Sequence, residues 1–243
     1  SIACADTLEN PAFLDGSHLR KFDIVLANPP YSIKEWNREK FMNDKWGRNF
    51  LGTPSQGRAD YAFIQHILAS MNDENGRCAI LLPHGILFRN EEKEVRTNLV
   101  KSDLLEAVIG LGPNLFYNAP MEACILFCNK NKDRERKNRI TFINAVKEVT
   151  RKNAESYLEQ HHIEKILHAF HSQEDIEQFK LSISTDDIAN KDFDLSIQKY
   201  VFIKDAEVEE ISFSSAISRW LNSQKEVHVQ YITLMDLLSN DKI

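Results

Sequence analysis

Glycine is scarce in this sequence, with eight residues among 243. The scarcity bears on cofactor binding, because a dinucleotide-binding loop needs three closely spaced glycines between a strand and a helix. The segment Gly110-Leu111-Gly112 lacks the third glycine and continues into Pro113 and Asn114, so it predicts a turn. The residues themselves therefore give no dinucleotide-binding fingerprint.

Cysteine is also rare, and its placement argues against a metal site. The four cysteines, each in or beside an apolar run, are Cys4, Cys78, Cys124 and Cys128. No second close pair and no nearby histidine completes a zinc-binding set. Four histidines cluster between residues 161 and 171, but no carboxylate or thiol set stands beside them. We therefore expect no metal and four reduced thiols in or near the core, which is typical of a cytoplasmic protein.

Long apolar runs are absent, and none approaches the roughly 20 residues of a membrane-spanning helix. No signal peptide is visible at Ser1. Apolar residues make up 42% and charged residues 27% of the chain, which predicts a globular protein without membrane contact. The length leaves room for one large domain, or for one domain with a small appendage.

Positive charge is not in excess overall: the net charge of −6 does not indicate nucleic-acid binding. Residues 34–58 differ, because this segment contains six basic residues and only three acidic ones. The interleaved aromatic residues are Trp36, Phe41, Trp46 and Phe50. Such a loop either contacts phosphates and stacks on bases, or is a solvated loop with its aromatics packed inward, and both interpretations stay open. A second basic segment, residues 130–139, lies between two predicted strands and predicts a charged hairpin tip.

The most informative segment is Asn28-Pro29-Pro30-Tyr31, which directly follows the apolar residues 22–27. The apolar run predicts a buried strand, and the two prolines predict a rigid turn at its end. In open α/β sheets, ligands bind just beyond the carboxyl ends of strands. The position therefore favours a functional turn, and the alternative is a turn that merely ends the strand and buries a tyrosine.

The chemistry of this turn suits a planar amino group. The Asn28 amide oxygen and the Pro29 carbonyl oxygen are two acceptors that can bind both amine hydrogens. Pro30 stiffens the turn, and Tyr31 can stack on the ring that carries the amine. Binding both hydrogens would aim the nitrogen lone pair at an electrophilic methyl group and raise its reactivity. The turn therefore predicts chemistry on an exocyclic amine such as adenine N6.

The apolar pattern predicts strands alternating with helices. Strands are expected at residues 2–5, 22–27, 77–82, 105–109, 123–127 and 140–143, and helices at 60–72, 91–101, 155–171, 207–221 and 230–238. A short helix around Ile188 is expected to be capped by Thr185 and Asp186. This order predicts an α/β fold with a mostly parallel sheet and an antiparallel edge. Soft boundaries fall near residues 150 and 204.

Five sequence blocks recur in the order of a known family. They are FDIVLANPPY (22–31), GRADYAFIQHIL (57–68), GRCAILLPHGILF (76–88), LLEAVIGLGPNLFY (104–117) and EACILFCNK (122–130). Over roughly residues 1–203 the sequence resembles the modification (M) subunit of type I restriction-modification systems, an adenine-N6 DNA methyltransferase that uses S-adenosylmethionine. The resemblance implies a partial Rossmann-like, S-adenosylmethionine-dependent methyltransferase sheet with a C-terminal helical extension. Residues 1–150 would be the C-terminal part of the catalytic domain, residues 151–203 its helical extension and residues 204–243 a helical tail.

The resemblance also implies roles for single residues in base binding. Asn28 and the Pro29 carbonyl would hold the amine, and Tyr31 would stack on one face of the adenine. The base must be extruded from the duplex, because N6 of a paired adenine is out of reach. Phe116 would stack on the other face, although Tyr117 remains an alternative.

The resemblance assigns a cofactor role to Asp6, at the end of the predicted strand 2–5. An acidic residue there would approach the amino group of the cofactor's adenine. The alternative is local, because Asp6-Thr7-Leu8-Glu9 has the spacing of a helix-capping box.

The family's glycine-rich loop, which binds the methionine part of the cofactor, has no counterpart before the Asn28 turn. The sequence starts about twenty residues before that strand and without a methionine. We therefore expect an N-terminally truncated piece, either a cloned fragment or a broken reading frame, that is nearly inactive alone. Residues 22–27 would lose a neighbouring strand and become a sheet edge. Because an apolar edge promotes association, we expect a dimer through that side.

The resemblance implies DNA and the specificity and restriction subunits of a type I complex as partners. One alternative is a noncatalytic assembly module in which residues after about 150 bind the specificity subunit. Another is glutamine-N5 methylation of a protein, which also uses Asn-Pro-Pro-Tyr on a planar amide. The order of the blocks and the helical tail argue against the second alternative.

Overall fold

The computed structural model describes residues 1–116, 121–152, 155–202 and five helical positions between 217 and 225. The chain divides into two compact units, Ser1–Ile203 and Lys204–Ile243. In the second unit Ile217, Trp220 and Leu221 are helical and exposed, within the predicted helix 207–221. The other positions of that prediction, and the predicted helix 230–238, lie outside the described residues. Within the described part, no helix is long and apolar enough to cross a membrane.

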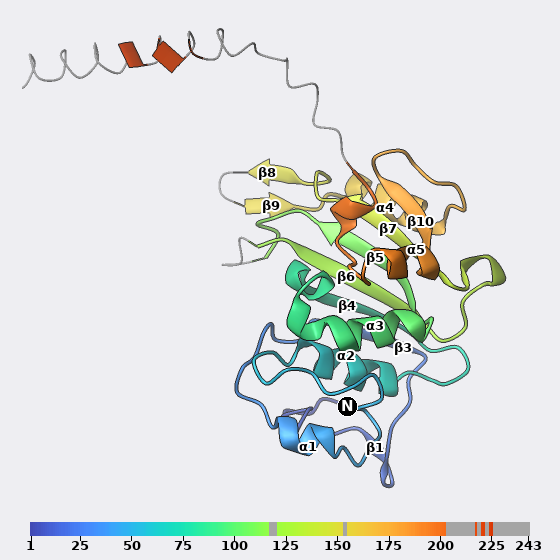
Figure 1. Ribbon diagram of the computed structural model, residues 1–243. Coiled ribbons are helices and arrows are strands. Elements are labelled where there is room, and N and C mark those ends of the chain that lie inside the picture. Colours follow the sequence, from blue (N-terminus) through green and yellow to red (C-terminus); the bar gives the residue numbers. More distant parts are fainter. Residues whose placement is uncertain (117–120, 153–154, 203–216, 218–219, 222–223, 226–243) are drawn as a thin grey trace, which may run out of the picture. The chain divides into compact units, whose positions relative to one another are not determined.

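A six-stranded sheet forms the centre of the first unit (Figure 1). Its strands, in spatial order, are β10 (Lys180–Ser184), β7 (Arg139–Ala145), β5 (Leu105–Leu111), β6 (Ala123–Asn129), β4 (Arg77–Pro83) and β3 (Ile24–Ala27). The pairs β3–β4 and β5–β7 are parallel, whereas β6 runs antiparallel to both its neighbours and β10 antiparallel to β7. The α/β class is confirmed.

The sheet is less parallel than predicted, because β6 is an antiparallel strand inside it and not at an edge. The chain between β4 and β5 contains the helix α3 (Lys93–Lys101) and skips one strand position. Only residues 112–122 separate β5 from β6, which is close to the minimum length of a parallel crossover. The chain therefore turns back and fills the skipped position antiparallel. The predicted antiparallel edge is present as β10.

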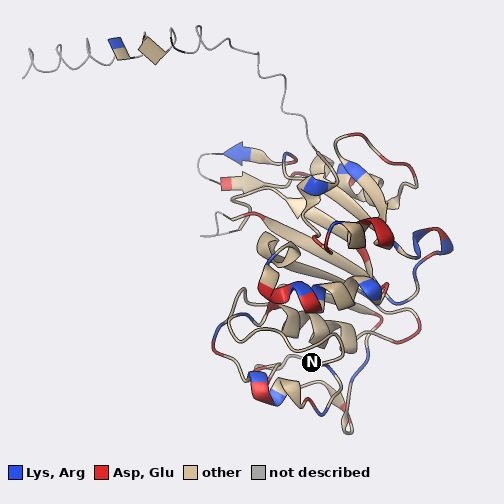
Figure 2. Ribbon diagram, in the orientation of Figure 1, with Lys and Arg blue, Asp and Glu red and all other residues tan. Residues whose placement is uncertain are grey.

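Four of the five helices of the unit lie against the sheet, whereas α1 packs near the start of α2, and short elements complete the unit. The helices are α1 (Arg38–Met42), α2 (Asp60–Ala69), α3, α4 (Gln160–His171) and α5 (Thr185–Asn190). The short 3₁₀ helices are η1 (His84–Leu87), η2 (Asn90–Glu92), η3 (Arg134–Arg136) and η4 (Ile197–Lys199). Two small antiparallel pairs are also present, β1 (Leu14–Asp15) with β2 (His18–Leu19), and β8 (Thr150–Lys152) with β9 (Glu155–Tyr157). Acidic and basic residues are interspersed on α1 and α3 (Figure 2).

The larger core lies between the sheet and the helices α2 and α3. Alternate residues of β4, Cys78, Ile80 and Leu82, are buried in it, because successive side chains of a strand face opposite sides. From α2, Tyr61 and Ile64 are fully buried in the same cluster. Burying a side chain of this size contributes about 1.5–3 kcal/mol. This packing holds α2 in place, so that its first turn stays next to the loops that follow β3 and β4.

The opposite face of the sheet is only partly covered. Ile166 and Ala169 of α4 pack there with Ile109 and Ile143. At the other end of the sheet, β3 is an edge strand, as the sequence predicted, and Ile24 and Leu26 are 62% and 78% exposed. The prediction that residues 22–27 form a buried strand is therefore wrong for the face of β3 that carries Ile24 and Leu26.

Residues 2–5 do not form the predicted strand. A run of four apolar residues is stable as a strand only when a neighbouring strand pairs with it, and none is assigned there in the described chain. Ile2 is fully exposed, and Cys4 is exposed, which contradicts the prediction of a core thiol. The other three cysteines are buried and free, as predicted.

Two helix starts differ from prediction. The helix expected over residues 155–171 begins only at Gln160, because Glu155–Tyr157 pairs with β8. The cap of α5 is Ser184, whose hydroxyl accepts a hydrogen bond from Asp187 N at 3.1 Å, and Thr185 is already the first helical residue. In both cases a local contact sets the first helical residue, and the apolar periodicity does not show where that contact forms.

The basic segment 130–139 is not a hairpin tip, because β5 lies between β6 and β7. The segment crosses the end of β5 and is rich in basic residues (Figure 2), of which Arg134, Lys137 and Arg139 are exposed. Two of its cations are used structurally. Lys132 is buried and donates to Asp103 at 2.6 Å and to the Leu105 carbonyl at 3.1 Å, and Arg136 binds Glu106 at 2.8 Å.

Candidate functional site

The Asn28-Pro29-Pro30-Tyr31 turn directly follows β3, as predicted. Because β3 and β4 are parallel, with Ala27 opposite Ile80, the turn lies beside the loop that follows β4. Asn28 and Pro30 are exposed, Pro29 is buried and Tyr31 is partly buried. The amide of Asn28 is therefore accessible while the backbone behind it is packed.

Tyr31 provides a neutral aromatic surface. Its pKa is raised, first by burial and then by the nearby Cys124 and Asp60. The phenol therefore stays protonated at neutral pH, and its ring is suited to stacking and not to acting as a base.

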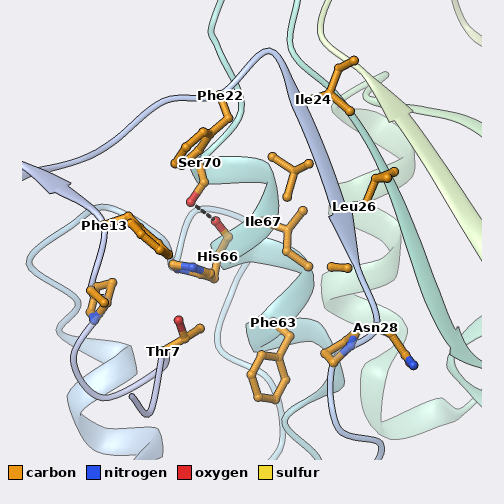
Figure 3. A pocket seen from close by; sticks show the side chains of 15 residues that line it. Thr7, Phe13, Phe22, Ile24, Leu26, Asn28, Phe63, His66, Ile67 and Ser70 are labelled. Carbon is orange, nitrogen blue, oxygen red and sulfur yellow. Dashed lines mark hydrogen bonds between the residues drawn. The ribbon is translucent and has the colours of Figure 1, made fainter. Parts of the chain in front are cut away.

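Two cavities flank the end of β3, and Asn28 lines both. The first, of about 450 Å³, lies between β3, α2 and the N-terminal segment (Figure 3). Its lining includes Phe13, Phe63 and His66, together with Asn28 and Pro29. The second, of about 380 Å³, is lined by Leu26, Ala27, Asn28, Ala79, Leu81 and Ile125. Both linings are mainly apolar, which favours a flat, uncharged ring over an anion.

Asp6 forms only part of the capping box that its sequence spacing offered as the alternative, because residues 7–9 form a turn and not a helix, and the Glu9 side chain binds Lys40. Its carboxylate Oδ1 accepts hydrogen bonds from Leu8 N at 2.9 Å and Glu9 N at 3.1 Å, and its carbonyl accepts one from Asn10 N at 2.8 Å. Asp6 is exposed, and its neighbour Thr7 lines the first cavity. The cofactor role of Asp6 stays a prediction.

Phe116 is partly buried and packs against the core cluster on the α4 side of the sheet, which Leu81 also contacts. Leu81 in turn lines the second cavity with Asn28. The stacking role of Phe116 stays a prediction, and its alternative, Tyr117, lies outside the described residues.

Of the two interpretations of the basic and aromatic loop 34–58, the structure mostly agrees with the loop whose aromatic side chains pack inward. Phe41 is buried and Trp36 packs edge-on against it, with ring centroids 5.7 Å apart. Arg48 is buried and forms an ion pair with Asp44 at 2.6 Å, although Phe50 remains 47% exposed. The sequence analysis missed this buried pair, because residues 44–48 are not helical and a spacing of four residues indicates a contact only on a helix.

A buried charge cluster behind the turn was also missed. Arg89 Nη1 lies 3.1 Å from Asp60 Oδ2 and 3.4 Å from Glu92 Oε2, and both carboxylates are fully buried. Glu92 Oε1 has no hydrogen-bonding partner among the described residues. Burial, with Asp60 nearby, raises the pKa of Glu92 to about 7 despite the opposing effects of Arg89 and Arg58. The Arg89–Glu92 spacing of three residues was the only local signal.

The raised pKa of Glu92 gives a pH prediction. Glu92 ionises near pH 4.5 in the unfolded chain but near pH 7 in the fold, so its contribution to the free energy of unfolding falls as pH rises through this window. We expect the stability advantage of Glu92→Gln over the wild type to grow by about 3 kcal/mol from pH 4.5 to pH 7. Urea unfolding at several pH values measures this difference.

The experiment compares the free energy of unfolding of Glu92→Gln with that of the wild type, because His66 and Glu92 have opposite effects on how stability changes with pH. Burial, then Arg48, lowers the pKa of His66 to about 4, so His66 makes the free energy of unfolding rise with pH between about 4 and 6.5. In the wild type, His66 therefore offsets part of the effect of Glu92 on the free energy of unfolding. Parallel pH profiles for the wild type and Glu92→Gln would contradict the assignment.

A mixed sheet with helices on both faces, and an Asn-Pro-Pro-Tyr turn at the carboxyl end of one strand, define an α/β protein with a candidate ligand-binding turn at a strand end. The sequence matches the family described as N-6 DNA methylase over residues 1–209. The chain belongs to this family.

The relatives specify the kind of methylase. The chain is 32% identical to the type I restriction enzyme MjaVII methylase subunit of Methanocaldococcus jannaschii, covering 93% of this chain and 39% of the relative. It is 31% identical to the HindI methylase subunit of Haemophilus influenzae, covering 91% and 50%. The chain thus spans half or less of the length of these two relatives.

Solved structures agree with these matches. The type I restriction-modification methyltransferase subunit from Streptococcus thermophilus has a TM-score of 0.74 and 36% identity, covering 81% of this chain and 41% of that one. The EcoKI M protein, at 16% identity and a TM-score of 0.61, shares the fold. The resemblance to type I M subunits and the methyltransferase fold are therefore confirmed.

Proposed function

We propose that this chain carries the base-binding half of an enzyme that transfers a methyl group from S-adenosylmethionine to adenine N6 in DNA. The observation that supports the proposal is the exposed Asn28 amide at the carboxyl end of β3, between two apolar cavities and next to Tyr31. The chain spans 39–50% of the first two curated relatives, and their remaining part would supply the rest of the site.

The turn would act on the amine by binding and orientation. Asn28 Oδ1 and the Pro29 carbonyl each accept one N6–H, while Tyr31 and Phe116 stack on the two faces of the extruded base. The lone pair of N6 would then point at the methyl carbon, so that a nitrogen–carbon bond would form as the carbon–sulfur bond of the donor breaks. The two oxygens stabilise the positive charge that develops on N6, and one N6 proton leaves to solvent.

S-adenosylmethionine would supply an electrophilic methyl group on a sulfonium. Asp6 is suited to the amino group of the cofactor's adenine. Both described hydrogen bonds of its carboxylate use Oδ1, so Oδ2 could accept a hydrogen bond from that amino group. Pro29 and Phe63 in the first cavity are apolar surfaces suited to an adenine ring.

A methylation assay tests the proposal. The purified chain should transfer little labelled methyl to DNA, because one acidic side chain does not hold the cofactor. A chimera that joins the chain to the unmatched part of the Streptococcus thermophilus subunit should methylate adenine when its specificity subunit is present. A silent chimera that folds and binds cofactor would refute the proposed activity, and methylation of a protein glutamine would favour the alternative acceptor.

We further propose that DNA and the specificity and restriction subunits are the partners of the complete protein, in the cytoplasm. Residues 204–243, which form their own unit, are the candidate contact with the specificity subunit. In a pull-down with that subunit, the chain without residues 204–243 should bind less than the full chain. Equal binding would place the contact elsewhere, and binding should not depend on Asn28.

The chain alone is expected to dimerise through β3. As the last strand of the described sheet, β3 has no further described strand paired with its outer edge, and it presents Ile24 and Leu26 to solvent. Sedimentation velocity should show a dimer, and Leu26→Lys should shift it to monomer. The matched control is Met42→Lys, at an exposed methionine on α1, which should stay dimeric. A wild-type chain that is monomeric at every concentration would contradict this interface.

A further inference from the structure

The residue that follows the candidate active-site turn has an unusual backbone conformation. Ser32 has φ +53°, in the left-handed region that costs a non-glycine residue roughly 1–2 kcal/mol. The chain therefore reverses sharply right after Tyr31. Something outside the turn has to hold this conformation, and the described contacts of Ser32 identify what does.

Asp60 is the residue that holds it. Its Oδ1 accepts a hydrogen bond from Ser32 N at 2.8 Å, and its Oδ2 lies 3.4 Å from Ser32 Oγ. Arg58 Nη1 donates to the same hydroxyl at 3.0 Å, and Ala59 N donates to the Ile33 carbonyl at 3.0 Å. Ser32 N belongs to the peptide unit that starts at the Tyr31 carbonyl. Fixing this unit fixes the backbone from which the Tyr31 ring projects.

Asp60 can do this because it is itself held. Its side chain is fully buried at the start of α2, and Arg89 Nη1 binds its Oδ2 at 3.1 Å. Arg89 follows β4, whereas Ser32 follows β3, so one carboxylate links the loops after two neighbouring parallel strands. A buried carboxylate that accepts from both a backbone N–H and a guanidinium makes strong, well-oriented hydrogen bonds.

We propose that Asp60 is a positioning residue for the methyl-acceptor site: it fixes Tyr31 and the Asn28 turn through Ser32 N–H, with Arg89 as its anchor. The inference rests on the proposed methyl transfer for its functional consequence, but the contact itself does not. Asp60 touches neither base nor cofactor in this scheme. Its effect is on the geometry of the residues that do, and a misplacement of about 1 Å in such a site lowers rates by about 100-fold.

Asp60→Asn is the variant that tests the contact. An asparagine has a single side-chain oxygen, so it cannot present an acceptor at both the Oδ1 position that Ser32 N–H uses and the Oδ2 position that Arg89 uses. In amide-exchange NMR of the full chain, the Ser32 amide should exchange about 10- to 100-fold faster than in the wild type, as expected for losing a hydrogen bond to a charged group. The side-chain amide signals of Asn28 should shift, while amides of β4 and β6 should not.

Asp175→Asn is the matched control. Asp175 Oδ1 accepts a hydrogen bond from Ser182 N at 2.8 Å, the same type and length of contact, but on β10 at the far edge of the sheet. This variant should change the Ser182 amide and leave the Asn28 signals in place. If Asp60→Asn does not fold, Asp60→Glu serves instead, because it keeps the charge for Arg89 but displaces the carboxylate by one methylene.

A kinetic measurement separates positioning from simple structural support. In the chimera described above, Asp60→Asn should lower kcat by about 10- to 100-fold and leave KM for S-adenosylmethionine within a factor of about two. If the wild-type chimera is inactive, the proposed function fails while the exchange experiment still decides the contact. Unchanged Ser32 exchange and Asn28 signals in a folded Asp60 variant would overturn the inference.

Discussion

Replacing Asn28 with alanine is expected to lower methyl transfer to adenine by about 10²- to 10³-fold, in the chimera that supplies the remaining part of the site. The side-chain oxygen is one of the two acceptors proposed to hold the N6 hydrogens and to stabilise the charge that develops on the nitrogen. Because Asn28 is exposed, its truncation should not destabilise the fold. Single-turnover incorporation of labelled methyl into DNA measures the effect.

Two further variants make this result specific. Asn28→Asp keeps an acceptor oxygen at the same place and should retain more activity than Asn28→Ala. Asn190→Ala, at an exposed asparagine at the end of α5, should behave as the wild type. Normal methylation by a folded Asn28→Ala chimera would refute the role of the turn, even though the family assignment would stand.

The largest stability effect is expected at Arg48. Its side chain and that of Asp44 are each 1% exposed, and Arg48 also donates to the carbonyls of Thr7 and Leu8 at 2.8 Å. Arg48→Met leaves Asp44 charged and buried without its partner, which costs about 3–5 kcal/mol. Urea unfolding followed by circular dichroism should show this loss in the free energy of unfolding.

The double variant separates the lost pair from lost packing. Asp44→Leu combined with Arg48→Met removes both charges and should recover much of the stability, because no unpaired charge remains. Lys45→Met is the control, since Lys45 is exposed beside the buried pair and should change stability by about 0.5 kcal/mol or less. A small effect of Arg48→Met would mean that water reaches Asp44.

The N-terminal segment explains why these contacts matter to the site. Arg48 holds the carbonyls of Thr7 and Leu8, and Thr7 lines the cavity beside Asn28. The predicted strand at residues 2–5 is absent, so this segment depends on side-chain contacts for its position. Arg48 and the turn around Asp6 supply them, and neither contact is visible in the local apolar pattern.

The sequence by itself determined the strands and helices whose apolar periodicity is strong. The helix predicted at 60–72 is Asp60–Ala69, and the strand predicted at 77–82 is Arg77–Pro83. Both have a clear pattern, because apolar residues recur every third or fourth position in the helix and form a continuous run in the strand. The sequence also determined the turn at Asn28, since two prolines end a strand whatever surrounds them. The order of the five blocks was enough to indicate the family, because each block encodes a local element.

Only the tertiary structure decided how these elements combine. The antiparallel place of β6, the exposure of Ile24 and Leu26, and the Asp60–Arg89 link between two strand ends depend on which strands become neighbours. Pairing partners and buried charges are set by contacts between residues far apart in the chain, and a local pattern carries no information about them. Periodicity therefore fixed which face of each element is apolar, and the assembled sheet fixed which of those faces are covered.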